Sequence, residues 1–134
     1  MEGGIVADPG SRHHPRMTTT LYGIPNCDTV KRARTWLDAH GIAYRFHDFK
    51  KDGVPEAGLD RWLTKVGWQT LVNRRGTTWR RLDDEARAAV VDADSARHVL
   101  IANPSLIKRP VVEWDGTDDV TTGFDAEAWT SRTV

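Results

Sequence analysis

The stretch YGIPNCDTVK, residues 22–31, contains the only cysteine of the 134-residue chain, Cys27. A short β-branched run precedes it at residues 18–22 and ends at Gly23, as is typical of a strand that runs into a turn. Beyond Cys27, apolar residues recur at i, i+3 and i+7, which predicts a helix over residues 28–39 that Gly41 stops. The core-facing positions of this helix are Val30, Ala33 and Leu37. The cysteine is therefore expected where a strand passes into a helix.

The composition limits the kind of protein this can be. At 15.1 kDa, with 39% hydrophobic and 28% charged residues, the chain fits a single globular domain, expected over residues 17–134. Lysine plus arginine and aspartate plus glutamate both number 19, so no global field recruits nucleic acid or a membrane. Residues 1–16 have no periodicity and are interpreted as a disordered tail or leader, with Met17 as the natural start. A single cysteine and no signal-peptide pattern favour the cytoplasm.

The rest of the chain predicts an α/β fold. Residues 42–49 alternate like a strand, which we expect to lie parallel to the first strand through the helical crossover. A helix starts near Glu56 and ends at Gly67, and two more are expected at residues 84–91 and 93–102, capped by Asp83 and Asp92. The last elements are an antiparallel hairpin and a helix, at residues 110–114, 120–122 and 125–132. The order is βαβ, a helical insert, then ββα.

Cys27 at a helix start has a chemical consequence. The first helical N–H groups have no partner within the helix and carry partial positive charge, so a thiolate there is stabilised and nucleophilic. Lys31, one turn on, adds to this effect, whereas the carboxylate of Asp28 opposes it. The alternative is an inert, buried cysteine, because free cysteines are among the most buried residues. The polar turn that ends in Asn26 favours the reactive interpretation.

Two concentrated cationic sets can supply an anion site. One is the segment NRRGTTWRR, residues 73–81, and the other is Lys108-Arg109-Pro110, directly before a predicted strand. The arginine fork suits oxyanions and carboxylates because it donates two parallel hydrogen bonds. The alternative for each set is a solvated surface loop. No metal site is predicted, because His40, His47 and His98 have no ligand spacing.

These motifs together resemble the ArsC-like family, which comprises glutaredoxin-coupled arsenate reductases, Spx-type regulators and YffB-type thiol reductases. The resemblance covers about residues 18–129 and is carried by YGIPNCDTVKRARTWLDAHGI, LVNRRGTTWRRL and NPSLIKRPVV, which look most like the YffB branch. It implies a thioredoxin-like, glutaredoxin-like fold in which Cys27 is the nucleophile, Arg75 and Arg109 face it, and Pro110 is cis. The residues expected to bind substrate or an anion are Asn26, Asp28, Thr29, Lys31, Arg75, Arg109 and Pro110.

Two departures from the family refine the expected function. A third arginine that arsenate reductases of the family share is absent near residues 122–124, which puts efficient arsenate reduction in doubt. The C-x-x-C pair of many Spx regulators is also absent, because Val30 stands at its second position. We therefore expect a monomeric monothiol reductase without a bound cofactor that uses glutathione or a similar small thiol, with glutaredoxin as a further partner. The alternatives are arsenate reduction and a non-enzymatic, Spx-like binding protein that docks a partner through Trp68, Trp79 and residues 74–81.

Overall fold

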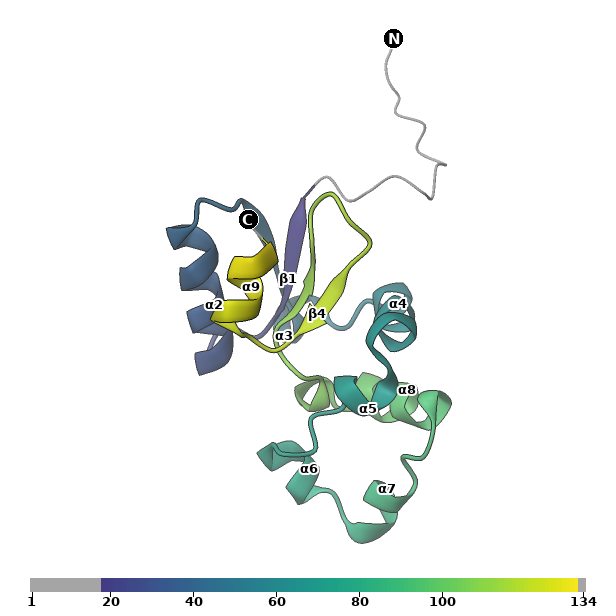
Figure 1. The fold of residues 1–134 in the computed structure, drawn as a ribbon. Coiled ribbons are helices and arrows are strands. Elements are labelled where there is room, and N and C mark those ends of the chain that lie inside the picture. Colours follow the sequence, from purple (N-terminus) through teal and green to yellow (C-terminus); the bar gives the residue numbers. More distant parts are fainter. Residues whose placement is uncertain (1–17, 133–134) are drawn as a thin grey trace.

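The computed structural model describes residues 18–132, in which four strands form one sheet in the order β2-β1-β3-β4 (Figure 1). β1 (Thr19–Gly23) pairs parallel with β2 (Tyr44–Asp48) and antiparallel with β3 (Val111–Glu113), and β3 pairs antiparallel with β4 (Val120–Thr122). The parallel crossover and the closing hairpin predicted from the sequence are both confirmed. The expected tail at residues 1–16 lies outside the described residues.

Neighbouring residues on the central strands point to opposite faces of the sheet, because side chains alternate along a strand. Leu21 and Val112 lie on one face, which α2 (Asp28–Ala39) and α9 (Ala126–Arg132) cover (Figure 1). This layer is filled by Val30, Ala33, Leu37, Trp114 and Trp129. Tyr22 and Val111 face the other way, into a core made with the helical insert. The core therefore has two layers, and the sheet lies between them.

The helical insert covers this second face. It contains α3 (Phe49–Asp52), α4 (Glu56–Val66), α5 (Trp68–Leu71), α6 (Thr77–Arg81), α7 (Asp84–Ala88), α8 (Ala93–Ala102) and the 3-10 turn η1 (Pro104–Leu106). The buried residues that α4, α5, α8 and η1 bring to the core are Leu59, Trp62, Leu71, Ala96, Leu100 and Leu106. α6 and α7 lie farther from the sheet than α4 does (Figure 1).

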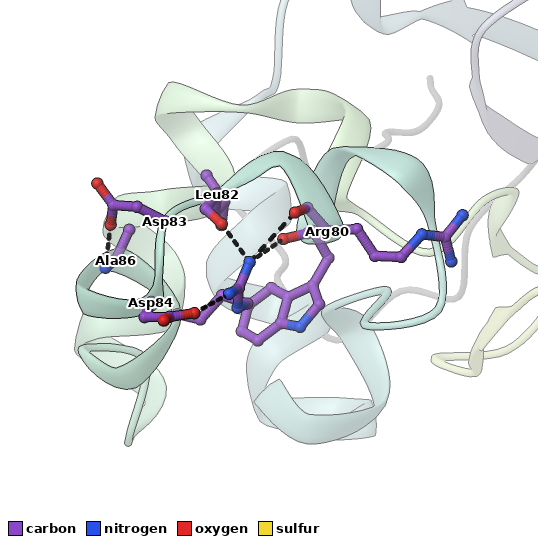
Figure 2. A network of polar contacts seen from close by, with 7 residues as sticks. Arg80, Leu82, Asp83, Asp84 and Ala86 are labelled. Carbon is purple, nitrogen blue, oxygen red and sulfur yellow. Dashed lines mark hydrogen bonds and ion pairs between the residues drawn. The ribbon is translucent and has the colours of Figure 1, made fainter.

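The junction of α6 and α7 is held by polar contacts rather than by a buried core (Figure 2). The guanidinium of Arg87 donates to the backbone oxygens of Trp79, Arg80 and Leu82, which end α6. It also pairs with Asp84. Asp83 accepts from the backbone N–H of Ala86 at 2.7 Å, as its predicted role of helix cap requires.

The other predicted cap is confirmed, one strand boundary is corrected, and two short helices were not predicted. Asp92 and Ser95 form a capping box at the start of α8. Phe49 does not continue β2 but begins α3, because Asp48 accepts from the N–H groups of Lys50 and Lys51 and so caps a helix. The arginine-rich segment, for which no helix was predicted, contains α6. The short helix α5 was not predicted at all. In the described part of the chain, no helix is long and apolar enough to cross a membrane.

Candidate functional site

Cys27 stands at the N-cap of α2, with extended backbone at φ −97° and ψ 123°. Its carbonyl accepts the first hydrogen bond of the helix, from the N–H of Lys31 at 2.9 Å. The turn before it is tight, because a Cβ added at Gly23 would lie 2.8 Å from Cγ2 of Val30. The glycine at the end of β1 therefore allows the strand and the first turn of α2 to approach closely, and this places the thiol just beyond the carboxyl end of a central strand of the sheet.

The thiol of Cys27 is partly buried, and its pKa is lowered from its ordinary value. Burial by itself raises this pKa, since it disfavours the thiolate. The effect is outweighed by hydrogen bonds from the backbone N–H of Val30, by a hydrogen bond and the charge of Arg109, and by the N–H of Thr29. A helix start and one guanidinium thus increase the thiolate fraction at neutral pH, as the sequence predicts.

Arg109 is brought to the sulfur by the turn before β3. Its peptide bond to Pro110 is cis, as expected from the resemblance. Its Nη1 donates to the backbone oxygen of Ser105 at 2.7 Å, which fixes one edge of the guanidinium. The buried Nε makes no hydrogen bond of ordinary geometry in residues 18–132. The guanidinium is therefore held beside the thiol, where its hydrogen bond and its charge lower the pKa of Cys27.

The two cationic sets meet because their segments pair. Val72 and Ile107 form an isolated antiparallel bridge. On its two sides, the N–H of Asn73 donates to the oxygen of Leu106 and the N–H of Lys108 donates to the oxygen of Leu71, both at 2.8 Å. This ladder lays the start of the arginine-rich segment beside Lys108 and Arg109. The two cationic sets, which are far apart in sequence, thereby lie side by side.

A cleft of about 320 Å³ opens at the thiol. Its lining consists of Cys27, Thr29, Arg32, Asn73, Lys108, Arg109, Gly123 and Phe124. Asn73 and Lys108 stand at the edges of the two predicted cationic sets, so the sequence carried a signal for them. Arg32 was missed, because five positions after Cys27 is not a helical repeat and only the placed helix shows that it reaches the cleft. Gly123 and Phe124 stand where the family's third arginine was sought.

The predicted site residues fall into four groups. Thr29 and Arg109 line the cleft together with Cys27. Asn26, Asp28 and Lys31 are exposed around the start of α2, and none of them lines it. Pro110 is the third group and is buried.

Arg75 forms the fourth group. It lines an adjoining cavity of about 400 Å³, which shares Asn73 and Lys108 with the Cys27 cleft. A direct approach of Arg75 to the sulfur therefore stays a prediction. Within residues 18–132, no group of three or more histidine, cysteine or acidic residues is placed to hold a metal ion.

The sequence model of the ArsC family matches residues 22–131, a range that begins just before the cysteine turn and ends within α9. The chain belongs to the ArsC family. A Haemophilus influenzae protein of uncharacterised function is 47% identical over 97 residues, 72% of this chain and 84% of its own length. The ArsC resemblance drawn from the motifs is thus confirmed.

Two solved structures agree with the fold, and together with one sequence relative they carry the names of the three family branches considered above. A structure titled YFFB protein has 47% identity and a TM-score of 0.79 over 85% of this chain and 97% of its own. An arsenate reductase (ArsC) related protein from Brucella melitensis has 49% identity and a TM-score of 0.68 over 87% and 95% of the two chains. The global transcriptional regulator Spx of Streptococcus mutans is 25% identical over 95 residues, 69% of this chain and 68% of that protein. The thioredoxin-like fold is confirmed.

Proposed function

We propose that this ArsC-family protein is a thiol-dependent reductase in which Cys27 is the only nucleophile and a small external thiol, such as glutathione, supplies the electrons. The observation that carries the proposal is the cysteine itself: a partly exposed thiol with a lowered pKa, beside Arg109, in an open cleft. An inert packing cysteine would have neither the cationic neighbour nor the cleft.

The proposed cycle consists of thiol–disulfide exchanges. The Cys27 thiolate attacks one sulfur of a substrate disulfide, which forms a mixed disulfide with Cys27 and releases the other half as a thiolate. The thiolate of one small thiol attacks the Cys27 sulfur and releases the second half of the substrate. A second small thiol then attacks the small thiol's sulfur in the remaining mixed disulfide and frees Cys27. Two small thiols are oxidised to their disulfide, and one substrate disulfide is reduced to two thiols.

An external thiol is needed because the sequence holds no second cysteine to resolve the mixed disulfide. The cleft suits an anionic thiol, since Arg32, Lys108 and Arg109 line it without an acidic side chain. A carboxylate of the small thiol gains charge-assisted hydrogen bonds from these donors. We also propose glutaredoxin as an alternative electron donor and the cytoplasm as the compartment, where small thiols stay reduced.

The test is covalent capture. The full chain is treated with glutathione disulfide at neutral pH without denaturant and examined by mass spectrometry. We expect one glutathione adduct on Cys27 that excess reduced glutathione removes, and no adduct in Cys27→Ser. An intact, unmodified Cys27 under these conditions contradicts the proposal.

Arsenate reduction is a second candidate, favoured by one observation. Although Gly123 and Phe124 stand where the third family arginine was expected, Arg32 and Lys108 join Arg109 around the thiol, so the cleft still has three cationic side chains. An assay of arsenate reduction coupled to glutathione and glutaredoxin decides it. Absence of turnover above a Cys27→Ser control rules this candidate out.

A further inference from the structure

The cavity next to the Cys27 cleft is not used by the mechanism above. It is lined by Gln69, Thr70, Val72, Asn73, Arg74, Arg75 and Lys108. We call it the annex. Its volume, about 400 Å³, exceeds that of the cleft, and Asn73 and Lys108 border both. Each space alone is at the small end of the range for ligand pockets, roughly 300–1,000 Å³, whereas the two together accommodate a longer molecule.

The annex has the charge of an anion site. Arg74, Arg75 and Lys108 line it, and no aspartate or glutamate does. Within residues 18–132, none of these three cations is ion-paired with a carboxylate, although Arg61, Arg87, Arg97 and Arg132 all are. In a chain whose formal net charge is zero, this local excess is built by the fold.

The loop that carries these cations is held in place. The side chain of Asn73 accepts from the N–H of Arg75 at 3.2 Å, and a Cβ at Gly76 would lie 2.7 Å from Asn73 Nδ2. Arg80 donates to the oxygen of Arg75 at 2.8 Å. The Arg74 guanidinium carbon lies 5.9 Å from the centre of the Trp68 ring, a cation–π distance. The cationic groups are therefore partly preorganised, which lowers the entropic cost of binding.

We propose that the annex is a second anion subsite, which selects thiols and disulfides that carry a carboxylate or phosphate several bonds from the reacting sulfur. This inference rests on the proposed function and deepens it. The sulfur lies at Cys27, the linking chain passes the shared wall of Asn73 and Lys108, and the distant anion is held by Arg74 and Arg75. A short anionic disulfide reaches only the cleft, so length as well as charge governs its rate.

The test compares four disulfides at one ionic strength: neutral hydroxyethyl disulfide, short anionic dithiodipropionate, glutathione disulfide with carboxylates far from sulfur, and coenzyme A disulfide with distant phosphates. Second-order rates of adduct formation on Cys27 are measured for the wild type and Arg74→Glu. Arg81→Glu is the matched control, since it makes the same charge change on α6 at a residue that lines neither cavity. Arg74 is chosen because the proposed reaction does not use it.

We expect Arg74→Glu to slow at least one of the two long disulfides by about tenfold, the loss of one charge-assisted hydrogen bond. Hydroxyethyl disulfide and dithiodipropionate should change by less than about twofold, and Arg81→Glu should leave all four within that range. If Arg74→Glu lowers the rate only with glutathione disulfide, the annex is a carboxylate subsite. If it lowers the rate only with coenzyme A disulfide, the annex is a phosphate subsite. Equal effects of Arg74→Glu and Arg81→Glu, or equal effects on short and long anions, overturn the inference.

A binding measurement separates this inference from the proposed reaction. S-methylglutathione and dephosphorylated and intact coenzyme A are titrated into Cys27→Ser, with and without Arg74→Glu. Weakening by Arg74→Glu supports the subsite even if Cys27 reacts with none of the disulfides, in which case only the proposed function fails. Binding that ignores Arg74, or its absence with all three ligands, overturns the subsite whatever the reactivity of Cys27.

Discussion

The Cys27 cleft and the buried carboxylate of Glu113 show two opposite uses of polar side chains in one small domain. Glu113 ends β3 and is only 3% exposed. Its Oε1 accepts from the hydroxyl of Tyr22 at 2.7 Å, and its Oε2 accepts from Trp62 Nε1 at 3.0 Å and from Arg61 Nη2 at 2.9 Å. In the cleft, by contrast, cationic donors surround a thiol and no carboxylate lines the wall.

The difference separates a structural polar cluster from a binding one. Around Glu113, donors from β1 and α4 converge on an acceptor that belongs to the chain, so the cluster fastens the helical insert to the sheet. Burial raises the pKa of Glu113, but the hydrogen bonds from Tyr22, Trp62 and Arg61 and the charge of Arg61 outweigh it and lower this pKa. In the cleft, donors remain for an acceptor that the chain does not supply. Variants of the two regions should therefore affect different properties.

Replacing the nucleophile gives the largest expected effect. Cys27→Ser should abolish disulfide exchange, because a serine hydroxyl is not ionised at neutral pH and cannot form a mixed disulfide. The free energy of unfolding should stay within about 0.5 kcal/mol of the wild type, since the side chain is partly exposed and the carbonyl that starts α2 is kept. Exchange rates and urea unfolding measure the two outcomes. Residual exchange in the variant would show that Cys27 is not the nucleophile, and a large loss of stability would show that its side chain supports the fold.

Removing the buried carboxylate of Glu113 should lower the stability of the fold and leave the reactivity of Cys27 unchanged. Glu113→Ala is expected to destabilise the fold by about 3 kcal/mol, because the buried indole N–H of Trp62 loses its acceptor and Arg61 its partner. The reactivity of the remaining folded protein toward hydroxyethyl disulfide should be unchanged. Urea unfolding followed by tryptophan fluorescence gives the stability. Arg61→Ala is the control: its side chain is 49% exposed, so it should cost less than half as much. Equal costs would show that the ion pair, and not the buried carboxylate, dominates.

The pH dependence of stability should come from the same carboxylate. A lowered pKa in the folded state means that the contribution of Glu113 is fully present above the unfolded-state pKa, about 4.3, and is lost as pH falls through the folded pKa. Glu113→Gln should cost about 2 kcal/mol at neutral pH. That gap should shrink as the pH is lowered from about 5 toward 2. Urea unfolding of both proteins along this series checks it, and a gap that stays constant or widens contradicts the assigned direction.

Arg109 should tune the thiol without holding the fold. Arg109→Ala removes a hydrogen bond and a charge that lower the pKa of Cys27, so this pKa should rise. The exchange rate at neutral pH should fall by about tenfold with an anionic disulfide, through less thiolate and weaker binding.

The effect of Arg109→Ala should appear in the exchange rate and should depend on pH. With neutral hydroxyethyl disulfide, the deficit of Arg109→Ala should close as pH rises, because at high pH both proteins are fully thiolate. Ultraviolet absorbance of the thiolate gives the titration directly. Arg45→Ala, a cation on β2 that does not line the cleft, is the matched control and should leave the titration unchanged. A deficit that persists at high pH would assign Arg109 to local structure.

The sequence predicted these regions unequally. Turns and helix caps depend on residues close in sequence, so the turn at Cys27 and the caps at Asp83 and Asp92 were predicted from short patterns. Phe49 was misassigned because an alternating run continues through it, whereas the side chain of Asp48 starts a helix there. The Glu113 cluster was not predicted, since its partners lie 51, 52 and 91 residues away. Likewise, the approach of Arg74 and Arg75 to Lys108 depends on the Val72–Ile107 bridge, which no local sequence pattern predicts.

The smallest expected effect tests a prediction made from helical spacing alone. Lys31, one turn after Cys27, was expected to stabilise the thiolate, yet it is exposed and does not line the cleft. An exposed lysine interacts through water and is screened by salt, so Lys31→Ala should change the exchange rate by less than about twofold. Measuring thiolate titrations of Lys31→Ala and Arg109→Ala at low and high salt sharpens the contrast: any Lys31 effect should vanish at high salt, whereas that of the partly buried Arg109 should persist. If the two variants behave alike, a diffuse field rather than a built donor set activates the thiol, and the distinction between the two regions loses its basis.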